Sequence, residues 1–118
     1  MLRPKTYLID IDGTIARHND VPFIDMSPLL NSVDTLKVLR HQGHKIILVT
    51  ARNEKFRERT IDNLNKCGII FDQLVMGVTS GQRVLINDLK PNPEDENNPM
   101  AVAINVERNK GFTLEEVT

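Results

Sequence analysis

The sequence predicts an α/β fold in which helices flank a mostly parallel, five-stranded, Rossmann-like sheet in three layers. The apolar runs at 7–9, 46–49 and 84–86 lack polar alternation, which is typical of strands covered on both faces. Segments with helical spacing of apolar residues follow the first two of these runs. Polar residues follow each run, and open α/β sheets bind ligands at the carboxyl ends of their strands. We therefore expect one active edge.

Length and composition narrow the classes of protein to consider. The chain has 118 residues, a formal net charge of −1 and one cysteine. A chain of this length holds one hydrophobic core, so residues 1–118 are expected to form a single domain. The near-neutral charge gives no overall attraction to nucleic acid or to anionic membranes. No apolar run approaches the ~20 residues that span a bilayer, and no secretory signal is visible, which favours a reducing cytoplasm.

The amino-terminal half predicts strands that alternate with helices. The expected elements are a strand at 7–11, a loop at 15–26, a helix from 27 to 43, a strand at 46–49 and a helix at 54–66. Ser27 followed by Pro28 is a helix-start signal, because a hydroxyl caps the first turn and proline suits its first position. Gly43 and Gly68 are expected to end the two helices.

The carboxyl-terminal half predicts short strands joined by irregular links. The expected elements are strands at 74–76, 84–86 and 101–106, a polar loop at 91–99 and a short helix from 113. A parallel crossover usually takes a dozen residues or more with a helix. Residues 77–83 are too few for a full helix, so we expect an extended link there.

Aspartates mark the active edge. Asp10 and Asp12 stand where the first strand ends, and Asp88 follows the fourth expected strand. Aspartate is depleted in strands and costly to bury unpaired, so a cation between these carboxylates explains them best. Mg²⁺ prefers oxygen ligands and is held in many sites by one or two carboxylates together with substrate phosphate. A calcium loop is disfavoured, because it needs oxygen donors at alternating positions where this chain has Ile9 and Ile11.

The segments Asp10-Ile-Asp-Gly-Thr14, Thr50 after an apolar strand, and Asn87-Asp88 after another resemble motifs I, II and IV of the haloacid dehalogenase superfamily of phosphohydrolases. The resemblance covers essentially the whole chain, and the first motif is the most specific. It implies a fold of the haloacid dehalogenase type without a cap domain, because residues 15–26 leave room only for a short flap.

By this resemblance Asp10 is the nucleophile that forms an aspartyl-phosphate, and Asp12 is the general acid that protonates the leaving oxygen and later activates water. Backbone N–H groups around Gly13 and Thr14 are expected to cradle phosphate oxygens. The magnesium ligands that the resemblance implies are Asp10, the backbone carbonyl of Asp12, Asp88 and, at or near the shell, Asn87.

The turn after the second strand supplies Thr50, Ala51 and Arg52. The resemblance implies that Thr50 hydrogen-bonds the transferring phosphoryl oxygens, and the alternative is a hydroxyl that satisfies the backbone of this turn. Ala51 and Arg52 are expected to bind substrate. A guanidinium suits phosphate geometry, although a solvated surface arginine is the alternative.

Motif III of the superfamily, a Lys or Arg that commonly stands on a helix before the fourth strand, has no clear counterpart here. Lys90 lies two residues beyond Asp88 on the active edge, so it is favoured as the catalytic cation. Arg83 stands at the start of the strand and is expected to reach the substrate only if the link before it bends back.

The leading hypothesis is a Mg²⁺-dependent phosphatase that acts on a phosphate monoester, such as a sugar phosphate or similar metabolite. The 3′-phosphatase domains of polynucleotide kinases resemble the same layout, so action on nucleic-acid ends is an alternative that we do not favour. A non-catalytic relative that binds phosphate or a protein is the alternative from another class, and the three aspartates together argue against it. An open site also leaves room for closure by a second subunit, so a homo-oligomer is an open alternative.

Overall fold

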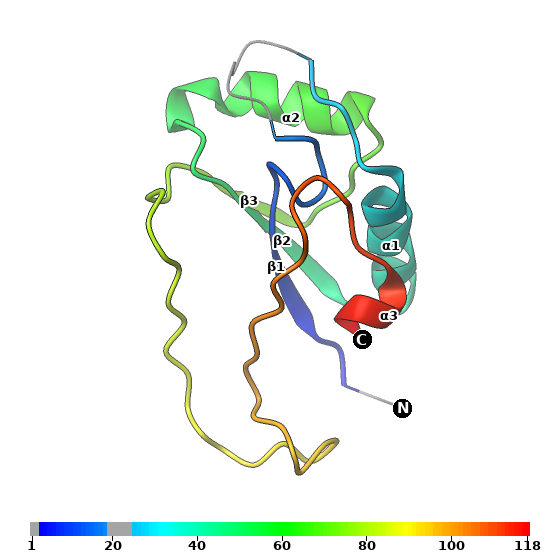
Figure 1. Ribbon diagram of the computed structural model, residues 1–118, viewed down its shortest axis with the longest axis vertical. Helices are drawn as coiled ribbons and strands as arrows, with labels where there is room; N and C mark the ends of the chain where they lie inside the picture. The colour runs from blue at the N-terminus through cyan, green and yellow to red at the C-terminus, as the bar shows by residue number, and fades with distance from the viewer. Residues whose placement is uncertain (1–2, 19–24) are drawn as a thin grey trace.

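The computed structural model describes residues 3–18 and 25–118, so residues 19–24 of the expected loop lie outside the described residues. The strands are β1 (Thr6–Asp10), β2 (Lys45–Val49) and β3 (Gln73–Val75), in the order β1-β2-β3. The helices are α1 (Leu30–His41), the 3₁₀ turn η1 (Glu54–Phe56), α2 (Arg57–Lys66) and α3 (Leu114–Val117). Both strand pairs are parallel, so the predicted α/β class with a parallel sheet is confirmed (Figure 1).

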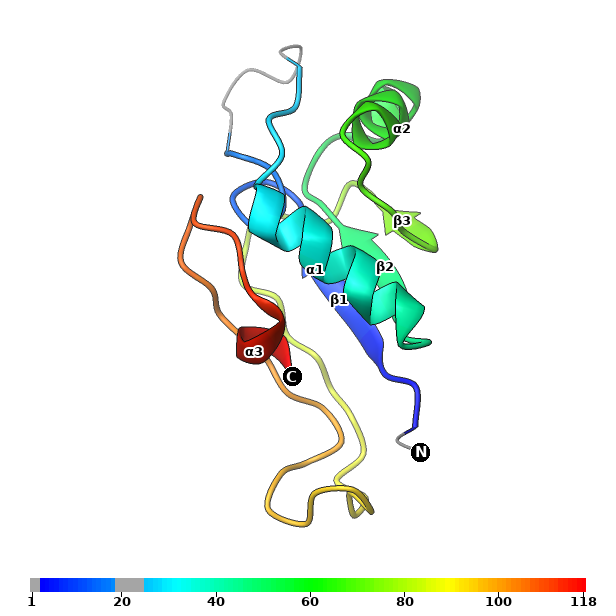
Figure 2. The same cartoon turned by 90° about the vertical axis from the view of Figure 1, so that its right-hand side faces the viewer.

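The helices α1 and α2 cover the same face of the sheet (Figure 2). The strand order follows the chain order, and crossovers of one hand, which parallel strands strongly prefer, then place successive helices on one face. Ile9, Ile46 and Leu48 from the strands are buried in one cluster with Leu36 of α1 and Leu64 of α2. Full burial of each such side chain contributes roughly 1.5–3 kcal/mol. This core fixes the strand register and therefore the place where each strand ends.

No helix formed by the described residues covers the opposite face of the sheet. Leu8 on β1 is 60% exposed and Val75 on β3 is 43% exposed. The structure therefore has one helical layer on one sheet face, where three layers were expected. None of the helices in the described part of the chain is long and apolar enough to cross a membrane.

The described residues form a sheet of three strands, whereas five were predicted. Residues 84–86 and 101–106 form no strand, and Val84 and Ile86 are 73% and 92% exposed. Instead, the segment 78–112 extends beyond the helices and returns to the end of β1 (Figures 1 and 2). A strand needs a hydrogen-bonded neighbour and a face that packs against another layer. The short link before this segment contains no helix that could cover such a face.

The helix α1 begins at Leu30 and not at the predicted Ser27-Pro28 signal. The Ser27 carbonyl accepts a hydrogen bond from the Arg17 N–H at 2.8 Å, and Pro28 pairs with Ala16 in an isolated bridge. These tertiary contacts hold the signal residues in extended backbone. The propensity of the local sequence is therefore overridden by pairing with the turn that follows β1.

Candidate active site

The turn after β1 leaves two aspartates at the carboxyl edge of the sheet. Asp10 is the last residue of β1 and lies in register with Val49 at the end of β2. Ile11 is 0% exposed, so its side chain lies in the core. The side chains of Asp10 and Asp12 are 35% and 20% exposed. Because successive side chains alternate along an extended chain, burying Ile11 leaves both carboxylates outside the core.

The backbone of this turn is internally hydrogen-bonded. Gly13 has φ +90°, a conformation that favours glycine. Its N–H donates to the Ala16 carbonyl at 2.7 Å, and the Thr14 N–H donates to the Ile11 carbonyl at 3.2 Å. The N–H groups expected to cradle phosphate oxygens are therefore used within the turn. The Thr14 hydroxyl lies in the site, where it donates to Asp10 Oδ2 at 3.2 Å.

Arg52 holds Asp12 through both carboxylate oxygens. Its Nε donates to Oδ2 at 2.9 Å and its Nη2 donates to Oδ1 at 2.7 Å. The two side chains are only 15% and 20% exposed. A bidentate pair of this kind fixes the orientation of both groups, so Arg52 lies beside Asp12 at the carboxyl edge of the sheet.

Thr50 links the turns after β2 and β3. Its N–H donates to the Val75 carbonyl at 2.9 Å and its carbonyl accepts from the Val78 N–H at 3.2 Å. Thr50 is 1% exposed, and its hydroxyl accepts from the Arg52 N–H at 3.1 Å, which is the backbone role that the sequence left open. A hydroxyl also carries one O–H donor. The neighbouring Ala51 is exposed.

Arg83 reaches Asp10. Its Nη1 donates to Asp10 Oδ1 at 2.9 Å, so the link before it does bend back. The bend starts at Gly77, whose N–H donates to the Arg52 carbonyl at 2.8 Å. Lys90, the cation that the sequence favoured, is exposed in a shallow depression beside Leu89 and has no described contact with Asp10. The structure brings Arg83 and not Lys90 to Asp10, because the segment after Arg83 does not pair with β1.

Asp88 and Asn87 do not join the other site residues. Both are exposed, and the Asn87 amide donates to the Asp88 carbonyl at 3.2 Å. The described part of the chain has no group of three or more His, Cys, Asp or Glu residues that could hold a metal ion. Asp10 and Asp12 bind arginines instead. The three-carboxylate magnesium site expected from the sequence is therefore not assembled in this arrangement.

A carboxyl-terminal loop that sequence reasoning missed packs against the same turn. The Asn109 N–H donates to the Gly13 carbonyl at 2.8 Å, and the Asn109 side-chain oxygen accepts from the His18 N–H at 2.7 Å. Asn109 has φ 62°, and the next glycine, Gly111, also has a positive φ of 73°. The Asn-Lys-Gly sequence signals a turn at this point, although no local pattern identifies its distant partner.

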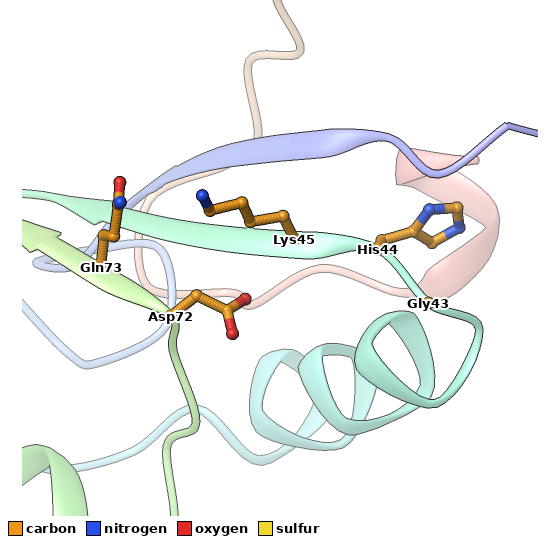
Figure 3. A pocket seen from close by; sticks show the side chains of 5 residues that line it. All are labelled: Gly43, His44, Lys45, Asp72 and Gln73. Carbon is orange, nitrogen blue, oxygen red and sulfur yellow. The ribbon is translucent and has the colours of Figure 1, made fainter.

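A second depression lies at the opposite edge of the sheet, where the strands begin (Figure 3). Its lining residues are Gly43, His44, Lys45, Asp72 and Gln73. Asp72 accepts a hydrogen bond from the Ile46 N–H at 2.7 Å and pairs with Arg40 at 2.9 Å. The Ile46 hydrogen bond, aided by the Arg40 charge, lowers the pKa of Asp72 below its ordinary value of 3.8. The carboxylate here joins α1, β2 and the start of β3, which is a structural role.

The geometry and the sequence comparison agree on the class of protein. A parallel α/β sheet whose first strand ends in Asp-Ile-Asp-Gly-Thr is the arrangement of haloacid dehalogenase superfamily phosphatases. The family model described as the polynucleotide kinase PNKP phosphatase domain matches residues 4–84, which is more than half of the chain. The chain therefore belongs to this family of phosphatase domains.

Two solved structures are similar to this chain. A crystal structure of a target protein from Vibrio cholerae has 23% identity and a TM-score of 0.53, covers 76% of this chain and 85% of that chain, and supports the fold alone. A chain in the structure of a Pnkp1/Rnl/Hen1 complex has 30% identity and a TM-score of 0.57 over 69% of this chain. The matched region is 30% of the length of that relative. No curated protein sequence matches this chain.

Proposed function

We propose that the chain is a phosphohydrolase that removes phosphate from a phosphate monoester, with Asp10 as the nucleophile. One observation carries the proposal. At the carboxyl end of β1, Asp10 is held by Thr14 and Arg83, and Asp12 lies two residues further on in a bidentate pair with Arg52. Membership in a phosphatase-domain family supports the same class of reaction.

The proposed reaction has two chemical steps. In the first, a carboxylate oxygen of Asp10 forms a bond to phosphorus, and the bond between phosphorus and the alcohol oxygen breaks. The leaving oxygen takes a proton from Asp12. In the second step a water oxygen forms a bond to phosphorus, the bond between phosphorus and the Asp10 oxygen breaks, and Asp12 takes a proton from the water. Inorganic phosphate leaves and the Asp10 carboxylate is restored. Covalent capture divides one difficult displacement into two easier ones.

The arginines have two successive partners in this scheme. Before substrate binds, Arg83 and Arg52 neutralise the two aspartates. The arriving phosphate competes for their guanidinium donors, because charge-assisted hydrogen bonds to phosphate are strong and geometrically well matched. Asp12 then loses part of its pairing with Arg52 and takes up a proton from solvent, which it gives to the leaving oxygen in the first step. For the Thr50 hydroxyl to donate to a phosphoryl oxygen, its turn must open when substrate binds, because Thr50 is 1% exposed.

The proposal includes dependence on Mg²⁺. This dependence requires residues 84–88 to move, because Asn87 and Asp88 do not join the other site residues in the described arrangement. Among the described residues β1 has a strand neighbour on one side only, and its Leu8 is 60% exposed. Parallel pairing of residues 84–86 with this free edge would cover apolar surface on both segments. It would also bring Asn87 and Asp88 to the level of Asp10. A fourth strand of this kind, with residues 101–106 as a fifth, would complete the predicted sheet.

We propose two classes of substrate, and the phosphate-release experiment compares them. A small phosphorylated metabolite such as a sugar phosphate suits an open site without a cap domain. A phosphate at a nucleic-acid end is favoured by the match to the polynucleotide kinase phosphatase domain. Binding of a polynucleotide releases condensed counterions, so its affinity falls steeply with salt. The affinity for a small monoester depends on salt much less.

The experiment measures phosphate release from sugar phosphates and from 3′-phosphorylated oligonucleotides, with Mg²⁺ and with a chelator. We expect release from at least one substrate. A kcat/KM that falls steeply with salt for the oligonucleotide, and exceeds that for every metabolite, would establish the nucleic-acid version. Folded protein that releases phosphate from no member of the panel contradicts the proposed function.

A further inference from the structure

The loop that carries Arg108 is fixed to the turn after β1 by hydrogen bonds across a long sequence separation. Asn109 donates to the Gly13 carbonyl at 2.8 Å and accepts from the His18 N–H at 2.7 Å. These contacts act on both sides of the residue, through its backbone and its side chain. They place the residue before it, Arg108, directly beside the Asp10–Thr14 turn.

Ser32 on α1 fixes the far end of the same loop. It is 0% exposed, and its hydroxyl donates to the Thr14 carbonyl at 2.7 Å while accepting from the Phe112 N–H at 3.0 Å. Phe112 is itself 3% exposed within the core. The loop is therefore anchored to α1 and to the site turn at once, which restricts the positions open to Arg108.

The side chain of Arg108 lies across Gly13. A Cβ atom on Gly13 would stand 3.2 Å from Arg108 Cγ and 3.9 Å from both Cδ and Nε. The aliphatic stem thus covers the glycine, and the positive charge begins within 4 Å of the same point. Arg108 is exposed and has no ion pair with any described residue, whereas Asp10 and Asp12 are already paired with other arginines.

We propose that Arg108 binds the phosphate group of the substrate beside Gly13, as a third arginine of the site; this proposal rests on the proposed function. A cation held beside a turn whose own carboxylates are neutralised has an anion as its natural ligand. A dianionic phosphate placed next to Asp10 also needs more positive charge than Arg83 supplies, because Arg83 already neutralises the carboxylate. Asn109 is the positioning residue that holds Arg108 there.

The test uses inorganic phosphate as the probe, measured by titration calorimetry on the full chain. Arg108→Met keeps most of the stem that packs on Gly13 and removes the charge, so folding is expected to be unchanged in a thermal melt. We expect it to weaken phosphate binding about tenfold and to raise KM by a similar factor. Arg108→Lys restores part of the affinity, because an ammonium lacks the planar fork. Lys110→Ala, which removes an exposed charge from the same loop, is the matched control and is expected to change neither quantity.

The outcomes separate this proposal from the function on which it rests. Weaker phosphate binding by Arg108→Met in a chain that hydrolyses no monoester would uphold the Arg108 site and reject the phosphatase activity. Equal phosphate affinity and equal KM in the parent and in Arg108→Met, with turnover intact, overturns the Arg108 site and leaves the activity standing. An equal loss of phosphate affinity in Lys110→Ala also overturns the Arg108 site, because the loss then follows from the change in net charge. Failure of the parent chain to bind phosphate overturns it as well.

Discussion

At the scale of single residues, the site is a set of arginine–carboxylate pairs arranged along one turn. Asp12 pairs with Arg52 and Asp10 with Arg83, while Arg108 lies over Gly13, the residue that follows Asp12. The pairs hold both carboxylates in defined positions before any substrate arrives. Preorganised charge of this kind is the main way in which proteins stabilise the charge that develops during phosphoryl transfer.

Arg83→Ala is predicted to reduce kcat/KM between about tenfold and a hundredfold, because it removes a charge-assisted contact worth roughly 1.5–3 kcal/mol. Lys90→Ala is predicted to change kcat/KM by less than about threefold, which is the size of effect expected from removing an exposed charge. Steady-state phosphate release from both variants makes the comparison. The opposite ranking would return the role of the motif III cation to Lys90, as the sequence alone favoured.

Gly13→Ala is predicted to destabilise the chain by about 1–2 kcal/mol. The residue has φ +90°, and a Cβ would stand 3.2 Å from Arg108 Cγ. Denaturant unfolding measures the loss. Gly43→Ala is the matched control, because Gly43 has φ +92° but nothing within 4 Å of its Cβ position. A larger loss at Gly13 than at Gly43 reports the contact with Arg108, and equal losses would mean that backbone strain alone explains both.

The sequence predicts the residues that stand at strand ends better than those that loops deliver. Asp10, Asp12 and Arg52 follow apolar strands, so their common edge follows from the parallel sheet. Arg83 and Arg108 reach the site through irregular segments, and no periodic pattern encodes the path of such segments. Their positions depend on hydrogen bonds between residues far apart in the sequence, such as the bond from Asn109 to Gly13.

At the scale of elements, the core determines which predictions succeed. β1, β2 and α2 were predicted close to their observed bounds, because their apolar residues fill one buried cluster. The run at 84–86 is equally apolar but forms no strand, since burial depends on a covering layer that local sequence does not reveal. The Ser27-Pro28 signal failed because pairing with the β1 turn outweighed the intrinsic propensity for a helix start.

Asp72 joins α1, β2 and the start of β3, and its removal is predicted to reduce stability in a pH-dependent way. Its pKa is lowered in the folded state, so its contribution is present above the ordinary value of 3.8 and is lost as the pH falls through the lower folded value. Asp72→Ala is predicted to lower the free energy of unfolding by about 1 kcal/mol at neutral pH. Chemical unfolding at neutral pH and well below pH 3.8 tests this.

The control for this prediction is Asp72→Asn, which keeps an acceptor for the Ile46 N–H but does not titrate. Its stability difference from Asp72→Ala is expected to stay constant across the same range of pH. The parent chain and Asp72→Ala are expected to differ less in free energy of unfolding below the folded pKa of Asp72. An unchanged difference would mean that the Ile46 hydrogen bond does not depend on the ionised carboxylate.

At the scale of the whole molecule, the long segment 78–112 decides whether the sheet is complete. It carries exposed apolar residues, Val84, Leu85 and Ile86, and it also carries Asp88. Within the described part of the chain, β1 has a strand neighbour on one side only, so its other edge is free. Figure 1 shows this segment outside the three-stranded sheet, and residues 84–86 within it have the composition of a strand.

Mg²⁺ is predicted to slow amide hydrogen exchange in residues 84–88, because Asp88 would then be drawn to the end of β1 and the preceding residues would pair with it. Exchange measured by mass spectrometry with and without Mg²⁺ tests the prediction. Asp88→Asn is expected to abolish the protection. Unchanged exchange together with full activity in a chelator would reject both the added strand and the magnesium requirement.

The most direct test of the central claim is the rate of phosphate release by purified Asp10→Asn. The amide is nearly isosteric with the carboxylate and keeps one oxygen acceptor, so the fold is expected to remain intact by circular dichroism and thermal melting. Asp62→Asn, an exposed change on α2, is the matched control and is expected to keep the parental rate. We predict that Asp10→Asn falls to the background rate of the assay. Release at the parental rate would contradict the assignment of Asp10 as nucleophile and the mechanism built on it.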